Sequence, residues 1–471
     1  MAQLKGSDSR IIVRKERTFK TIPTVSIHPC ELVWDEFVAA NVVATADATV
    51  YKKGTKSCKL AVAAGASTGI LASDNIASTD LSHCTKVGMW IRSSVALSSG
   101  DLKLLLDDTA LCASPLETIN IPAVAAGEIN TWKYVKLTLA AAGSDTAIIS
   151  VGINMAVDKG AFDFYVDDIR GLEGDAVIIP FNNAKMGLSE ALEDSAAISS
   201  GRQPLKPVGG AITGSGTTSH EFNPYMAVLL KHILGSVTTT DLTGSKYSHV
   251  MTIGDLGEGL AIEIQHRTER QFTLYHCKGN GFSLSQAATG KVTLDCTWEI
   301  AAEEVATNET QLDGDPTNYG HKPFSSKFGI FTEGGVAAPG LATNFTVNYN
   351  NNISGEPTIG SEGQRDSLTE GMPKIDFSVD MLYKDNTYMD KAKALTESKI
   401  KLENLNGTGV GTLGNEYAAV EMTEILYARP QQNIDGPKGL KANFTGIAYF
   451  DDDAGGTAIT VTIRNSQAVV E

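Results

Sequence analysis

The stretch SHEFNPYMAVLLKHILG, residues 219–235, predicts one well-defined helix. Asn223 is a favourable N-cap, and Pro224 stands at the first helical position, where its missing N–H is not needed. Apolar residues recur at every third or fourth position, which predicts an amphipathic helix. Gly235 favours the left-handed conformation that ends a helix. The surrounding sequence is typical of strands and turns, because 45 glycines and many Thr, Ser and Asn residues separate short apolar runs.

Length and composition predict a folded, acidic protein with more than one domain. The chain has 471 residues, 42% of them hydrophobic, which is enough to bury a core. Its net charge of −16 argues against wrapping a nucleic acid, because phosphate binding needs clustered Lys and Arg. The first 29 residues differ, since six basic and two acidic residues give them a net charge of +4. A basic arm on an acidic body favours contacts between like subunits; a solvated arm is the alternative.

No stretch predicts a membrane span or a leader. Apolar runs stay below the roughly 18 residues that a span requires. The start MAQLKGSDSR lacks the apolar core of a signal peptide. The six cysteines form no CxxC pair, and we expect reduced thiols in a protein made in the cytoplasm.

Residues 30–173 are expected to form an antiparallel sandwich, because alternating stretches are separated by regular turn signals. The candidate strands are Ala46–Tyr51, Ser57–Ala64, Lys86–Arg92, Leu102–Asp107, Thr131–Leu139, Ile148–Asn154 and Phe162–Ile169. The pieces YKKGTKSCKLAV (51–62), KVGMWIRS (86–93) and FDFYVDDIRGL (162–172) resemble the jelly-roll modules related to carbohydrate-binding and galactose-binding-like domains. The resemblance implies a jelly roll and leaves its ligand open.

Sugar binding by such a module would require exposed aromatic rings. Trp90 and Trp132 are expected to lie on inward strand positions and to pack in the core. Trp34 and Tyr165 then remain as the candidate glycan contacts.

Some relatives of these modules carry a structural calcium ion. Glu31, Asp35 and Asp167 are the candidate ligands here, because calcium prefers hard oxygen ligands. The alternative is that these acids are solvated at the ends of strands.

Residues 174–304 and 305–471 share an order of elements. The first segment has a Gly-rich strand, the helix PYMAVLLKHILG, the strand LAIEIQHR and a hairpin closing on KVTLDCTWEIAAEE. The second has the strand KIDFSVDMLY, the helix-like TYMDKAKALTES, the strand KIKLENLNG and a hairpin closing on GLKANFTGIAYFDDD. This order predicts two related β modules, each with a helix, after an arm at residues 1–29 and the insert at residues 30–173.

No pattern predicts catalysis or a cofactor. Gly409–Gly414 satisfies GxGxxG, but a strand-like NEYAAVEM follows in place of the helix that a dinucleotide site needs. We therefore expect a hairpin loop there. No G-x-S-x-G, HExxH or Walker A sequence is present, and the eight histidines are scattered. We expect no enzyme, no cofactor and no catalytic residues.

Three pieces of the sequence resemble the major tail tube proteins of phages with long non-contractile tails. They are GSDSRIIVRKERTFKTIP (6–23), VIIPFNNAKMGLS (177–189) and PVGGAITGSGTTSHEFNPYMAVLLKHILGS (207–236). The resemblance implies a mainly β fold, in which tube modules form β-sandwiches that close with their neighbours into a ring walled by a β-barrel. Stacked rings would form the tail tube of a virion assembled in the host cytoplasm.

The same resemblance implies partners. These are further copies of the chain and the tape measure, terminator and distal tail proteins. DNA would pass through an acidic lumen during ejection without specific binding, because an acidic wall repels phosphate. Two modules per chain favour a trimeric ring over a hexamer, and the jelly roll would decorate the tail and contact host glycans. The alternative function is a surface or secreted carbohydrate-binding protein.

Overall fold

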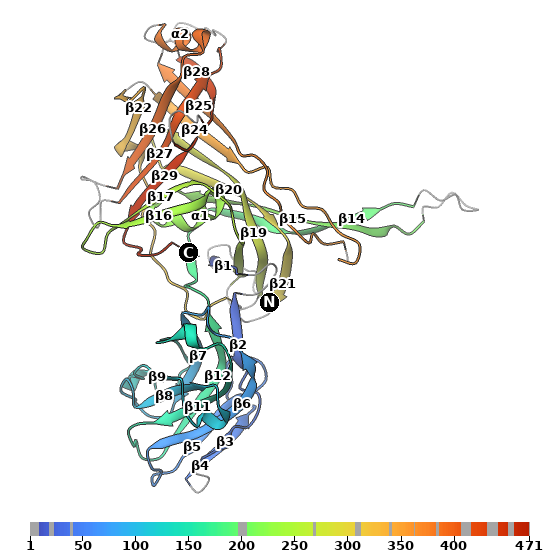
Figure 1. Cartoon of the computed structure of the whole chain (residues 1–471), viewed down its shortest axis with the longest axis vertical. Helices are drawn as coiled ribbons and strands as arrows, with labels where there is room; N and C mark the ends of the chain where they lie inside the picture. The colour runs from blue at the N-terminus through green and yellow to red at the C-terminus, as the bar shows by residue number, and fades with distance from the viewer. Residues whose placement is uncertain are drawn as a thin grey trace. The chain divides into compact units, whose positions relative to one another are not determined.

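The protein is mainly β, with three antiparallel sheets and two α-helices among the described residues of a computed structural model (Figure 1). The described residues are 9–17, 23–37, 41–195, 205–266, 270–306, 312–338, 342–361, 363–382, 386–406, 416–430, 441–450 and 456–470. The chain divides into two compact units. Unit 1 comprises Met1–Thr21, Val177–Thr307 and Asn318–Glu471, and unit 2 comprises Ile22–Ala176 and Asn308–Thr317.

Unit 2 is a sandwich of two sheets. One has the order β10-β7-β12-β5-β4 with β2 paired to β12, and the other has the order β3-β6-β11-β8-β9. The strands are β2 (Thr24–His28), β3 (Asp35–Glu36), β4 (Val42–Asp47), β5 (Ser57–Val62), β6 (Gly69–Thr79), β7 (Lys86–Ser93), β8 (Leu102–Asp107), β9 (Glu117–Asn120), β10 (Lys133–Thr138), β11 (Ile148–Met155) and β12 (Phe162–Leu172). Alternate residues such as Met89 and Leu104 fill a core between the two sheets.

All seven strands predicted for this region overlap observed strands. The bounds predicted for Ala46–Tyr51 were wrong, because only Ala46 and Asp47 lie in a strand and β4 ends at Asp47. The Asp47 carboxylate accepts hydrogen bonds from the backbone N–H groups of Thr49 and Val50, at 2.7 and 3.1 Å. Such a local bond turns the chain and ends the strand.

Unit 1 contains a connected sheet of 18 strands that folds around one large core. Its strands are β1 (Ser9–Lys15), β13 (Val177–Ile179), β14 (Asn183–Glu193), β15 (Val208–Glu221), β16 (Gly235–Asp241), β17 (Tyr247–Ile253), β18 (Leu260–His266), β19 (Arg270–Ala287), β20 (Thr293–Ile300), β21 (Ala302–Ala306), β22 (Gly329–Glu333), β23 (Val336–Ala337), β24 (Ala342–Asn350), β25 (Lys374–Leu382), β26 (Ser398–Leu405), β27 (Tyr417–Tyr427), β28 (Lys441–Ala448) and β29 (Thr460–Asn465).

The helix predicted at residues 223–235 is present, but it is not a surface helix. A 3-10 turn at Pro224–Met226 leads into α1 (Ala227–Leu234), and the Asn223 side chain accepts a hydrogen bond from the N–H of Tyr225 at 2.9 Å. Gly235, with φ of 97°, follows the helix. Every residue of α1 except Lys231 is buried, so α1 is part of the core of unit 1 and contacts β16, β17 and β19.

Two sets of strands in unit 1 pair in the same order. The hairpin β14–β15 precedes α1, as the hairpin β24–β25 precedes α2 (Thr387–Ala394). β15 pairs with β20 and β20 with β19; likewise β25 pairs with β28 and β28 with β27. β19 further pairs with β18 and β21, as β27 pairs with β26 and β29. A further ladder, between β19 and β24, joins the first set to the second.

Candidate functional site

Seven strands of unit 1 form one continuous run in the order β14-β15-β20-β19-β24-β25-β28. One face of this run carries buried apolar residues such as Trp298, Phe345 and Phe377. The intervening residues form the opposite face, which we call the polar face. Most of them are uncharged polar or acidic residues: Ser219, Ser283, Ser285, Thr293, Asp295, Thr297, Thr346, Asn348, Asp376, Ser378, Asp380, Asn443 and Thr445. The same face also carries Lys185, Glu299, Lys374, Lys441 and the exposed Ile447. Strict alternation along each strand separates the two faces.

The acids of the polar face have polar or basic neighbours. Asp295 accepts a hydrogen bond from the Ser219 hydroxyl. Asp376 lies 2.9 Å from the Lys374 ammonium group. Asp380 accepts a hydrogen bond from the Asn443 amide at 2.6 Å. The face is therefore dominated by hydroxyl and amide groups, with its negative charge partly offset.

One outer edge of this run is β14. It forms a ladder with β15 on one side, whereas on its other side β21 approaches it without a ladder among the described residues. On that edge the N–H of Leu188 donates a hydrogen bond to the Glu303 carboxylate at 3.0 Å. A side chain thus satisfies a backbone group that a neighbouring strand would use.

A second free edge belongs to β27. Its pairing with β26 ends at Ile425, which lies opposite Ser398. Beyond Ile425 this side of β27 pairs with no strand in the described part of the chain. In β19 the corresponding side continues, because Gly281–Ala287 pair with β24.

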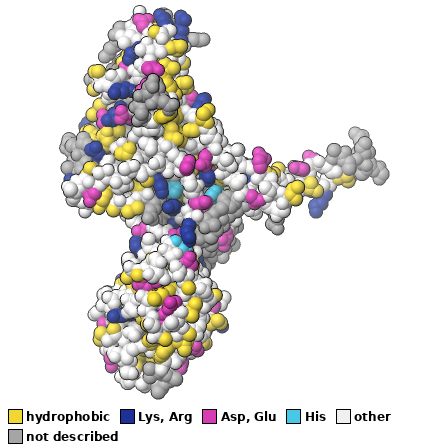
Figure 2. Space-filling view, in the orientation of Figure 1, with side chains coloured by type: hydrophobic (Ala, Val, Ile, Leu, Met, Phe, Trp, Pro, Cys, Tyr) yellow, Lys and Arg dark blue, Asp and Glu magenta, His cyan; other side chains and the backbone are white. Residues whose placement is uncertain are grey.

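The outer half of the β14–β15 hairpin projects from the body of unit 1 (Figures 1 and 2). Leu192 and Val208 are 71% and 63% exposed there, and Leu205, which precedes β15, is 39% exposed. The segment at Gly363 meets the hairpin at Ile212, whose N–H donates to the Gly363 carbonyl at 2.8 Å. Beyond that contact, a two-stranded ribbon by itself is marginally stable in water. Exposed apolar side chains and a free edge together indicate that this hairpin contacts another molecule.

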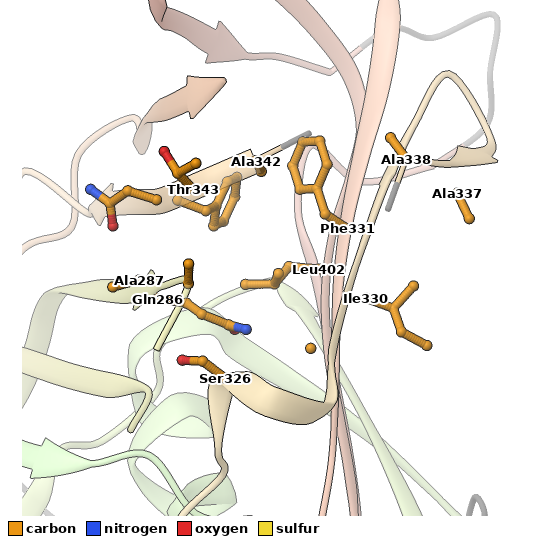
Figure 3. Close-up of a pocket in the computed structure, with 14 residues that line it drawn as sticks. Gln286, Ala287, Ser326, Ile330, Phe331, Ala337, Ala338, Ala342, Thr343 and Leu402 are labelled. Carbon is orange, nitrogen blue, oxygen red and sulfur yellow. The ribbon is translucent and has the colours of Figure 1, made fainter. Parts of the chain in front are cut away.

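A pocket of about 260 Å³ lies in unit 1 where β19, β22, β24 and β26 meet (Figure 3). Phe331, Phe345 and Leu402 form much of its lining. The amide oxygen of Gln286 and the hydroxyl of Ser326 are buried there without a hydrogen-bond partner among the described residues. None of the lining residues is ionisable, so the pocket offers no group for acid–base chemistry.

The two candidate glycan contacts lie on opposite sides of one sheet in unit 2. Trp34 is 1% exposed and belongs to the core, with its ring 5.3 Å from that of His28. It therefore presents no ring face to a sugar, in contrast to the expectation from sequence. Tyr165 is 6% exposed and lies on the outer face of β12, beneath the cationic groups of Lys59 and Arg92.

Trp90 and Trp132, which were expected in the core, lie on the outer side of the same sheet and are partly exposed. Trp90 alternates with the buried Met89 and Ile91, and its ring lies 5.1 Å from that of Tyr134. Trp132 meets Tyr165 edge to face at 6.2 Å. The sequence of β7 could have shown which side of the sheet Trp90 occupies. Successive residues of a strand point to opposite sides, and Trp90 stands between the apolar residues Met89 and Ile91, which point into the core.

The structure does not bring the three candidate calcium ligands together. Asp35 pairs with β6 in one sheet, whereas Asp167 is in β12 of the other. Both oxygens of Glu31 accept hydrogen bonds from Thr55, at 2.8 and 2.6 Å. One oxygen of Asp167 accepts bonds from the N–H groups of Lys52 and Lys53, at 2.7 and 2.9 Å. Glu31 and Asp167 thus fasten the loop before β5.

Other chemistry is limited in the described residues. No group of three His, Cys, Asp or Glu side chains there could hold a metal ion. None of the helices in the described ranges is long and apolar enough to cross a bilayer. The GxGxxG sequence at Gly409–Gly414 lies outside the described residues.

Comparison with solved structures finds carbohydrate-binding modules. A crystal structure of a family 30 carbohydrate-binding module has 16% identity and a TM-score of 0.25, covering 32% of this chain and 88% of that chain. The family 30 module of a cellulosomal cellulase of Clostridium thermocellum has 12% identity and a TM-score of 0.19, covering 36% of this chain and 99% of that one. These likenesses concern the fold alone.

A family model decides the identity. No curated protein matches the chain. The model described as "Phage tail tube protein" matches residues 129–448, which is more than half of the chain. The match includes the strands of the polar face from β14 to β28. The chain therefore belongs to the phage tail tube protein family and is a structural, non-enzymatic protein of the virion tail.

Proposed function

We propose that the chain is the repeating subunit of a long non-contractile phage tail tube. Copies close into rings, the rings stack, and the resulting tube conducts DNA during ejection. The observation that carries this proposal is the repeated pairing order in unit 1, which ends in a free strand edge on either side. Ring closure leaves no such edge exposed to aggregation.

The ring contains three chains in this proposal. The pairing order β14-β15-β20-β19 recurs as β24-β25-β28-β27, which supports two tube modules at residues 174–304 and 305–471. Three chains then supply six modules. A chain with a single module would need six copies to build a ring of the same size.

The polar face lines the channel in this proposal. The apolar core and α1 lie on the other face of the seven-stranded run, so only the polar face can turn toward an open lumen. The lysines of this face, Lys185, Lys374 and Lys441, lie on three different strands among hydroxyl and amide groups and form no cationic cluster, so DNA passes without lasting contact. The chain's net charge of −16 adds long-range repulsion.

The ends of the tube meet the tape measure, terminator and distal tail proteins, as the family resemblance implies. The inserted jelly roll at residues 30–173, which lies within unit 2, decorates the outside of the tail. Host surface glycans are its proposed ligand. The partly exposed ring of Trp132 supports this, because it meets Tyr165 beside the cationic groups of Arg92 and Lys59, and an aromatic ring beside cationic side chains can stack on a sugar and bind its hydroxyl groups.

The ring is tested by purifying the protein and imaging its assemblies. Electron microscopy should reveal rings or tubes, and native mass spectrometry of single rings should give the mass of three chains, each of 49.9 kDa. Six chains per ring would contradict the two-module proposal. A protein that stays monomeric at high concentration would contradict the tube proposal itself.

Glycan binding is tested separately on an array of surface polysaccharides. Wild-type protein should bind some glycans, and Trp132→Ala should lose that binding at an unchanged melting temperature. Trp34→Phe is the control for the buried ring and should retain binding. An array without any bound glycan would remove the proposed ligand without affecting the tube.

A further inference from the structure

We infer that the pocket where β19, β22, β24 and β26 meet binds a small uncharged compound with an aromatic ring and a hydroxyl group. The pocket lies within unit 1, and its use does not depend on ring formation. It combines an apolar lining with two buried polar side chains, Gln286 and Ser326 (Figure 3). Small-molecule sites are typically built in this way, because apolar contacts hold the ligand and a few polar groups orient it.

Gln286 occupies a strand position that normally carries an apolar side chain. Phe282, Leu284 and Gln286 alternate along β19 on its buried side, and Gln286 lies directly opposite Phe345 of β24. Gln286 is 8% exposed, and its amide oxygen has no hydrogen-bond partner among the described residues. A buried acceptor without a partner is unfavourable, so this position indicates a bound molecule that donates to Gln286.

Ser326 places a second such group beside the first. It begins the 3-10 turn Ser326–Phe328 before β22, and its backbone N–H donates to the carbonyl of Gly290 at 3.0 Å. Its hydroxyl is buried and has no partner in the described part of the chain. Both residues lie against Gly329, where an added Cβ would overlap the amide nitrogen of Gln286 and lie 3.2 Å from the carbonyl oxygen of Ser326. One ligand hydroxyl can therefore donate to Gln286 and share a second hydrogen bond with Ser326.

Apolar side chains form the rest of the lining and leave room for a ring. Phe331 of β22 lies directly opposite Leu402 of β26, and the rings of Phe331 and Phe345 are 6.0 Å apart. Ala338 and Ala342 line the same region with short side chains. An apolar cavity of about 150 Å³ is large enough to bind benzene. The pocket has about 260 Å³, which accommodates a substituted ring.

The lining also decides against an ion or water alone. None of the lining residues is ionisable, so a charged ligand would lose its hydration without gaining a counter-charge. Water would satisfy the two polar groups but would leave the apolar surfaces of Phe331, Phe345 and Leu402 hydrated, which is unfavourable. Ile330 and Ala337 line the pocket and are exposed, so a ligand can enter from solvent between them.

The test uses para-fluorophenol as the probe and its fluorine NMR signal as the readout. Para-fluorotoluene has nearly the same shape but no hydroxyl group, and para-fluorobenzoate carries a charge. Titration of the wild-type protein should broaden and shift the signals of para-fluorophenol and para-fluorotoluene. The signal of para-fluorobenzoate should not change, because the pocket offers it no counter-charge.

Three variants locate the binding site. Gln286→Met removes the amide and keeps the length of the side chain. It should weaken the binding of para-fluorophenol about tenfold, the ratio that one buried hydrogen bond gives, and leave para-fluorotoluene unaffected. Ala342→Leu fills the pocket and should abolish the binding of both probes. Gln364→Met is the matched control, because Gln364 does not line the pocket, and it should bind both probes like the wild type. Circular dichroism verifies that each variant is folded.

Wild-type protein that binds neither uncharged probe would overturn the inference and mean that the pocket holds water only. Binding that both Gln286→Met and Ala342→Leu leave unchanged would place the probes elsewhere and would overturn it as well. Tubes verified by electron microscopy should bind the probes as free subunits do. Binding by free subunits alone would mean that a neighbouring copy fills the pocket in the tail, so that a small molecule is not its occupant.

Discussion

The buried carboxylate of Glu16 accepts a hydrogen bond from the backbone N–H of His276 at 2.6 Å. This contact ties the residue after β1 to β19, across 260 positions of the sequence. Glu16 is fully buried, and its second oxygen lies 3.6 Å from the ring of His276, which also faces Glu258 at 3.5 Å. Burial, with a smaller contribution from the charge of Glu258, raises the pKa of Glu16 to about 8.

The raised pKa of Glu16 predicts that unit 1 loses stability as the pH rises. The native state holds the proton more tightly than the unfolded state, so the contribution is fully present below pH 4.5 and is lost as the pH passes about 8. The loss is at most about 5 kcal/mol. Glu16→Gln keeps the acceptor for His276 and should flatten the dependence of melting temperature on pH between about 5 and 9. If the melting temperatures of the variant and the wild type changed with pH in the same way, Glu16 would not be the source of the pH dependence.

Asp167 predicts a similar dependence in unit 2. Burial raises its pKa to about 7, and the neighbouring charges of Asp168 and Glu31 act in the same direction. Stability should therefore fall as the pH rises from about 4 toward about 8. Asp167→Asn should reduce this fall in a melting experiment, because the amide oxygen still accepts from the loop. Asp163→Asn on the same strand, where Asp163 is paired with Lys59 at the surface, is the matched control for the loss of one carboxylate.

Leu229→Asp should prevent soluble folding. Leu229 is 2% exposed within the core of unit 1, and an unpaired charge there costs several kcal/mol or more. Leu229→Met preserves the volume and should cost less than about 1.5 kcal/mol. Soluble yield and circular dichroism measure the difference. A well-folded Asp variant would mean that α1 is peripheral.

Gly281→Ala should destabilise the junction between β19 and β24. A Cβ atom at Gly281 would lie 2.2 Å from the carbonyl oxygen of Tyr349, and a backbone oxygen cannot move aside easily. We expect a loss of about 1–3 kcal/mol in chemical denaturation. Gly143→Ala is the matched control, because nothing lies within 4 Å of its added Cβ. Equal denaturation midpoints for the two variants would contradict the predicted clash.

Local signals in the sequence were sufficient where the cause is local. Asn223 and Gly235 bound the helical segment as predicted, because a cap bond and a left-handed residue act within one turn. The helix near Asn386–Ser398 is also present, as α2. The strand β24 went unpredicted although Phe345, Val347 and Tyr349 alternate in it, because Asn and Gly residues around it resemble a loop.

The sequence did not reveal which side of a sheet faces a core. Trp34 and Trp132 are chemically alike, yet Trp34 is buried and Trp132 is partly exposed. The difference arises because the two sheets of unit 2 bury only the faces that they turn toward each other. The association of residues 312–317 with unit 2 was equally invisible, since it joins segments distant in the sequence.

The sequence by itself determined the mainly β character, the two helical segments and the resemblance to tail tube proteins, because these depend on short-range periodicity, caps and motifs. Only the tertiary structure decided the burial of α1, the composition of the polar face and the free edges of β14 and β27. The physical reason is that burial and strand pairing are properties of contacts between distant residues. The helix within residues 219–235 is thus an interior element of a mainly β protein. It is buried because strands that are distant in the sequence pack around it.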